Sequence, residues 1–194
     1  MKNDNPFNAK MVTVLAIFRF DFLLTFFLFV ISNFFAKIHL ILFITNKFDF
    51  DILSKGKKMK LWQIIVALFG IAISVAATYL VWSKFKVEME YNYNGLLLLI
   101  FQHIYYMVET ILLLLIIIFG QKALEIWTKK RNVPWGGIIC GVTWGIAHVI
   151  SRGEVDIQLG LFATVSGFLF GAAYLLANRD FKKSWLILYL MFAF

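Results

Sequence analysis

The stretch that decides the fold is Gly95–Phe119, GLLLLIFQHIYYMVETILLLLIIIF, whose 25 residues include one charged side chain, that of Glu109. A membrane-spanning helix needs about 20 consecutive apolar residues, because the hydrocarbon core of a bilayer is about 30 Å thick. Leu61–Trp82 and Leu159–Asn178 meet this requirement without any charged residue, and Trp135–Ser151 is a shorter uncharged stretch. The sequence therefore predicts an all-α, polytopic transmembrane helical bundle.

The two ends of the chain leave the number of spans open. The run Met11–Thr45 favours one span near residues 12–36, and two tight spans are the alternative. Ser184–Phe194 is too short to cross a bilayer alone, so it is half-inserted, interfacial or the start of a longer helix. We expect about five to six membrane helices in one integral membrane domain, with N-terminal helices and a basic loop in 1–94 and a core in 95–194.

The composition excludes an ordinary soluble domain. Hydrophobic residues make up 61% of the chain and charged residues 15%, against about 45–50% and about 25% in soluble domains. The single Cys excludes a disulfide scaffold. The net charge of +8 comes from basic residues that lie mostly between apolar runs, which favours the lipid bilayer as partner and not nucleic acid.

The basic residues also predict how the loops are distributed across the membrane. Loops 46–60, 120–134 and 179–183 together contain twelve Lys and Arg residues, whereas the N-terminus, 83–94 and 152–158 contain five. Because cytoplasmic loops are enriched in Lys and Arg, we expect the first set to be cytoplasmic in an integral protein of the bacterial cytoplasmic membrane.

Glu109 is the most informative residue for function. A carboxylate in a membrane helix is costly and marks a functional site by default. Gln102, Tyr105, Tyr106 and Glu109 share one helix face, since they are spaced at i, i+3, i+4 and i+7. This polar stripe is either a buried hydrogen-bonded network that fixes helix packing, or the setting of a general base or an ion site.

His148 is the second candidate site residue. It lies about 20 Å along its helix from the predicted inner end, and Glu109 lies about 15 Å from the inner end of its own helix. The two side chains could therefore occupy a similar depth on facing helices. We expect a structural role for His103, which points about 120° away from Glu109. The sequence defines no cofactor; a divalent metal at Glu109 and His148 is the one metal site that it leaves open.

Small residues form two rows that predict close helix packing. Gly137, Gly141 and Gly145 are four residues apart, and so are Ala163, Gly167 and Gly171. Residues with this spacing share one helix face and let two backbones approach closely in lipid.

Residues 95–194 resemble the CPBP family, the CAAX proteases and bacteriocin-processing enzymes also called the Abi family. Val133-Pro134-Trp135 opens a helix in which Trp144-x-x-x-His148 stands where the family has FxxxH. The segment Gly167–Tyr174, GFLFGAAY, resembles the glycine-rich helix of the family. The chain departs from the pattern in two places. Glu109 is followed by Thr110 instead of a second Glu and by leucines where the motif has Arg, and the final run Trp185–Phe192 has neither His nor Asn.

The resemblance implies an intramembrane endopeptidase that hydrolyses a peptide bond of a membrane-associated peptide or protein terminus. In such an enzyme Glu109 would activate the water, and His148 would orient it or stabilise the oxyanion. The alternative is a catalytically inactive membrane scaffold or immunity protein that binds a peptide or partner, or a small transporter subunit. The missing third motif favours the inactive alternative, whereas the matched depth of Glu109 and His148 favours the enzyme.

Overall fold

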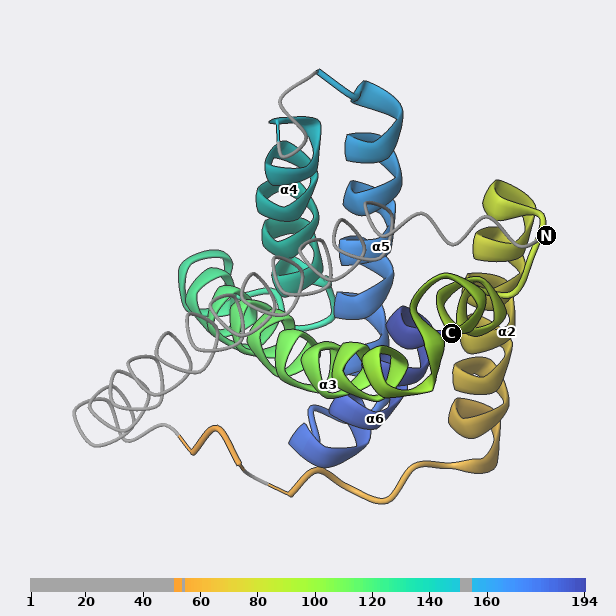
Figure 1. The fold of residues 1–194 in the computed structure, drawn as a ribbon. Helices are drawn as coiled ribbons and strands as arrows, with labels where there is room; N and C mark the ends of the chain where they lie inside the picture. The colour runs from red at the N-terminus through yellow and green to blue at the C-terminus, as the bar shows by residue number, and fades with distance from the viewer. Residues whose placement is uncertain (1–50, 54, 151–154) are drawn as a thin grey trace, which may run out of the picture. The chain divides into compact units, whose positions relative to one another are not determined.

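The computed structural model describes residues 51–53, 55–150 and 155–194, with the backbone alone at positions 81 and 82. These residues belong to one compact unit, Asp51–Phe194. The predicted span near residues 12–36 lies outside the described residues. The described ranges contain helices and no strand, which confirms the all-α class. The helices are α2 (Leu61–Trp82), α3 (Lys86–Thr128), α4 (Trp135–Ile150), α5 (Ile157–Leu176) and α6 (Phe181–Ala193) (Figure 1).

Three of the described helices, α2, α3 and α5, are long and apolar enough to cross a membrane. This finding supports a lipid bilayer as the environment of the chain. Helix α4 has 16 residues and α6 has 13, so both are shorter than a usual span. The expected total of five to six membrane helices stays a prediction, whereas the bounds predicted for Leu61–Trp82 coincide with those of α2.

Helices α4 and α5 lie side by side (Figure 1) and pack through the predicted glycine rows. A Cβ atom built on Gly141 would lie 2.6 Å from the backbone oxygen of Thr164, and one built on Gly167 would lie 2.6 Å from Cα of Gly141. A Cβ atom on Gly137 would lie 2.9 Å from Cα of Gly171. The two backbones nearly touch, as the spacing of small residues predicts.

Helix α3 is longer than the predicted span in both directions. It begins at Lys86, breaks at Gly95, where φ is 74° and ψ is 173°, and then continues to Thr128. The break divides α3 into a first limb, Lys86–Asn94, and a long second limb. The predicted loops 83–94 and 120–134 are therefore largely helical. Three polar residues of these segments, Lys86, Glu90 and Gln121, are buried and have hydrogen-bond partners inside the protein.

Gln121 shows how this extension is stabilised at the inner end. Its buried side chain donates to the carbonyl oxygen of Val133 at 2.8 Å and to Oε1 of Glu125 at 2.7 Å. It also accepts a hydrogen bond from the N–H group of Gly136 at 2.9 Å. One amide thus holds the last turns of α3 against the start of α4, and the connection shortens to Lys129–Pro134.

Hydrogen bonds join the described parts of the three loops that were predicted to lie on one side. Nζ of Lys183 donates to the carbonyl oxygen of Lys57 at 3.1 Å, and Nδ2 of Asn178 donates to that of Lys58 at 3.2 Å. Nη2 of Arg179 donates to Oε1 of Glu125 at 2.5 Å and to the carbonyl oxygen of Arg131 at 2.8 Å. We call residues 55–60, 129–134 and 177–183 the basic end.

Helix α6 starts at this end with a well-formed cap. Oδ1 of Asp180 accepts from the backbone N–H of Lys183 at 3.0 Å, and Oδ2 lies 3.0 Å from Nζ of the same residue. Asp180 therefore occupies the N-cap position, in which a carboxylate is favoured. The predicted run Ser184–Phe194 is the larger part of a helix that begins at Phe181.

Candidate functional site

A charged cluster lies at the bend of α3. The break at Gly95 turns the first limb so that Glu90 meets Tyr106 of the second limb, and the Tyr106 hydroxyl donates to Oε1 of Glu90. Nζ of Lys86 lies 4.1 Å from the centroid of the Tyr106 ring. Only 8% of the surface of each of Lys86 and Glu90 is exposed to solvent. Two ionisable residues of the first limb are thus buried against one tyrosine.

Lys86 also joins this cluster to α6. Its Nζ donates to the carbonyl oxygen of Phe192 at 2.6 Å and lies 4.8 Å from the centroid of the Phe192 ring. Lys86 therefore ties the first limb of α3 to α6.

Glu109 borders the same cluster. The carboxyl group is half-buried, it is hydrogen-bonded to the Tyr105 side chain, and the charge of Lys86 acts on it. The Tyr106 side chain is within hydrogen-bonding reach of Gln102. The predicted stripe therefore contains two hydrogen-bonded pairs, Tyr105–Glu109 and Gln102–Tyr106. The charge of Lys86 acts on both Glu90 and Glu109, so the two carboxyl groups have the same cation in their neighbourhood.

His148 is anchored within α4. Its Nδ1 lies 2.9 Å from the carbonyl oxygen of Trp144, and its ring packs against the Trp144 ring with centroids 4.8 Å apart. The Trp144 ring in turn contacts Phe192 at a centroid distance of 6.4 Å, and Phe192 contacts Tyr106 at 5.2 Å. Phe192 is therefore an aromatic residue shared by the Trp144–His148 pair and the charged cluster.

The predicted distance from Glu109 to the inner end of its helix needs correction, because it assumed a helix that ends at Phe119. Helix α3 continues to Thr128, so Glu109 lies about 28 Å along the axis from the inner end of its helix. Figure 1 shows α3 running across α4 and α5 and not alongside them. A direct contact between Glu109 and His148 stays a prediction.

His103 interacts with α6, in line with the structural role that we expect for it. Its Nδ1 lies 3.0 Å from the Tyr189 hydroxyl, and its ring contacts Tyr189 and Phe194. From the sequence, Lys86 counts only as a loop charge, and Glu90 is not singled out. Their spacing of four residues, which places opposite charges on one helix face, is the signal that would have indicated them.

The described ranges do not contain three or more His, Cys, Asp or Glu side chains grouped closely enough to hold a metal ion. A hollow lies between α4 and α5 and is lined by apolar and small residues, with no contribution from Glu109 or His148. Its lining consists of Val142, Gly145, Ile146, Val149, Ile157, Gly160, Leu161 and Thr164.

The fold and this cluster define a helical membrane protein with a buried charged network at a helix bend. Comparison with known proteins adds no relative, since no family model, curated protein or solved structure matches the chain significantly.

Proposed function

We propose that this chain is a CPBP-like intramembrane endopeptidase with Glu109 as its general base. The observation that carries the proposal is the position of Phe192, which contacts Trp144 of the Trp144-x-x-x-His148 motif and also contacts Tyr106 and Lys86. Phe192 therefore lies between the Trp144-x-x-x-His148 motif and the charged cluster that Glu109 borders. In this proposal α4 and α6 are also embedded in the bilayer, and the basic end faces the cytoplasm.

The proposed reaction uses Glu109 and His148 in distinct roles. Glu109 accepts a proton from water, and the resulting hydroxide attacks the carbonyl carbon of a peptide bond near the membrane. His148 stabilises the oxyanion that forms. The C–N bond then breaks, and the leaving amine takes the proton from Glu109. The hydrogen bond from Tyr105 holds the carboxyl group in place during these steps, and the positive charge of Lys86 acts on it.

The test compares two carboxylates of α3. The full chain is reconstituted in liposomes with a quenched fluorescent, farnesylated peptide that ends in Cys-aliphatic-aliphatic-X, and cleavage is followed by mass spectrometry. Glu109→Gln should lower cleavage about 100-fold or more, because the amide accepts no proton. Glu88→Gln is the matched control, since Glu88 is exposed, and it should cleave normally. Equal cleavage by both variants would refute the proposal.

A second candidate is an inactive scaffold that binds a peptide or a partner protein. Leu113 and Leu114 are fully buried where the family motif has Arg, and the hydroxyl of Thr110 donates to the carbonyl oxygen of Tyr106 at 2.8 Å. Thr110 is thus engaged within its own helix. If the wild-type chain binds the peptide without cleaving it, and Glu109→Gln binds it equally well, the scaffold is the correct function.

A further inference from the structure

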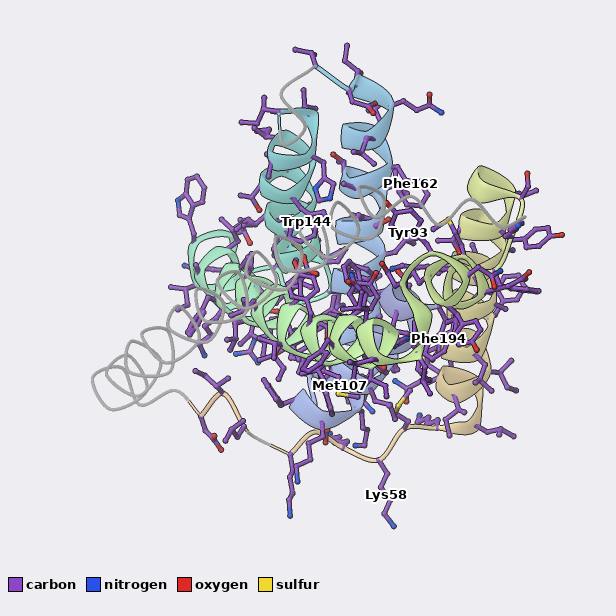
Figure 2. The ribbon with its side chains drawn as sticks, in the orientation of Figure 1. Lys58, Tyr93, Met107, Trp144, Phe162 and Phe194 are labelled. Carbon is purple, nitrogen blue, oxygen red and sulfur yellow. The ribbon has the colours of Figure 1, made fainter. Side chains whose placement is uncertain are left out.

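We propose that the basic end is a binding surface for the headgroups of anionic phospholipids in the adjoining leaflet. Three chain segments contribute exposed cations to it, and the side chain of Lys58 points away from the helices (Figure 2). The exposed cations are Lys55, Lys57, Lys58, Lys60, Lys129, Lys130, Arg131 and Lys182.

The acidic residues of this region do not neutralise that charge. Glu125 is paired with Arg179 at 2.5 Å, and Asp180 is paired with Lys183 at 3.0 Å. Each acid is matched by a cation that is not among the eight exposed ones. The positive potential of the surface is therefore left for an external anion.

The cations are held together before any ligand arrives. Asn178 and Lys183 donate to the backbone carbonyl groups of Lys57 and Lys58, and Oδ2 of Asp180 accepts from the N–H group of Gly56 at 3.1 Å. These bonds use the backbone atoms of residues 56–58, so the side chains of Lys57 and Lys58 stay exposed. Preorganisation of this kind lowers the entropic cost of binding.

The position of the surface favours a lipid as the anion. Helix α2, which is long enough to span, begins at Leu61 directly after Lys60. Trp62 is 56% exposed and Trp127 is 80% exposed, and both lie beside the basic end in the sequence. Exposed tryptophans are enriched at the level of the headgroups. Binding of a dissolved polyanion would not account for exposed tryptophans at this position.

The experiment titrates the full chain in dodecylmaltoside micelles with dioleoylphosphatidylglycerol or dioleoylphosphatidylcholine and records the midpoint of thermal unfolding. Phosphatidylglycerol should raise the midpoint, and phosphatidylcholine should not. The variants Lys57→Gln/Lys58→Gln and Lys130→Gln/Arg131→Gln each remove two cations and should each weaken the apparent affinity for phosphatidylglycerol about 30-fold. Lys84→Gln, which removes an exposed cation outside the basic end, is the matched control and should bind as wild type.

Two further measurements on the wild-type chain do not depend on the folding of any variant. Raising the NaCl concentration should weaken the stabilisation by phosphatidylglycerol, because exposed charges are screened by salt. Inorganic polyphosphate at the same phosphate concentration should stabilise the chain less than the lipid. Equal effects of the two phospholipids, of polyphosphate and lipid, or of Lys84→Gln and the paired variants would overturn the proposal. None of these results depends on peptidase activity.

Discussion

Replacing Gly141 by alanine tests the packing of α4 against α5 most directly. The new methyl group would lie 2.6 Å from the backbone oxygen of Thr164, whereas an ordinary contact begins at 3.4 Å. The two helices must therefore separate by about 0.8 Å, the difference between these distances. Overpacking costs about 1–3 kcal/mol, which offsets the gain of about 1 kcal/mol from replacing glycine in a helix.

Gly70→Ala is the matched control, because a Cβ atom on Gly70 of α2 would meet nothing within 4 Å. It should show the gain in helix propensity alone. We therefore expect Gly141→Ala to be less stable than Gly70→Ala by about 2 kcal/mol, which corresponds to about 4–8 °C in unfolding midpoint for a chain of this size. Thermal unfolding in detergent measures the difference. Equal midpoints would show that α4 and α5 are not in close backbone contact.

Three further predictions concern topology, the charged cluster and acid sensitivity. A Cys placed at Lys57 should resist a membrane-impermeant thiol reagent in intact cells, whereas one at Lys84 should react; the opposite pattern would invert the proposed topology. Lys86→Met should lower the free energy of unfolding by about 3 kcal/mol, since it removes the buried cation whose charge acts on the buried Glu90 and which donates to the Phe192 carbonyl oxygen. Adding Glu90→Gln to that variant should restore most of the loss, and an additive decrease in unfolding experiments would exclude their coupling. Burial alone would raise the pKa of the Asp180 carboxyl, but hydrogen bonds from the Lys183 backbone and side chain lower it overall. The stabilisation by this carboxylate is present above its unfolded pKa and is lost as the pH falls through the lower folded pKa. In Asp180→Asn the midpoint of thermal unfolding should therefore fall less than in the wild type as the pH is lowered. The same pH profile in both proteins would contradict this role.

The sequence predicts the apolar part of the fold well. Leu61–Trp82 coincides with α2, because its ends are marked by Lys60 and by the polar residues after Trp82. The glycine rows were predictable for a simple geometric reason: a spacing of four places them on one face. Both features depend on local chemistry that can be read from neighbouring residues.

The polar parts were less predictable, since they depend on distant partners. Lys86 and Glu90 look like loop charges until the break at Gly95 brings them to Tyr106 and Phe192. Gln121 likewise extends α3 only because Val133 and Gly136 are available to it. The stripe around Glu109 was predictable from helical spacing, whereas its cation, Lys86, was not.

The break at Gly95 has an evolutionary consequence. Nothing lies within 4 Å of a Cβ atom built there, but its φ of 74° is one that L-residues rarely adopt. Selection at this position therefore depends on which backbone conformation a residue can adopt and not on the size of its side chain. Among descendants of this chain we expect position 95 to remain Gly, because a φ of 74° combined with a ψ of 173° is a conformation that essentially only Gly adopts among L-residues. A D-alanine introduced by chemical synthesis, although bulkier than glycine, should leave the bend intact.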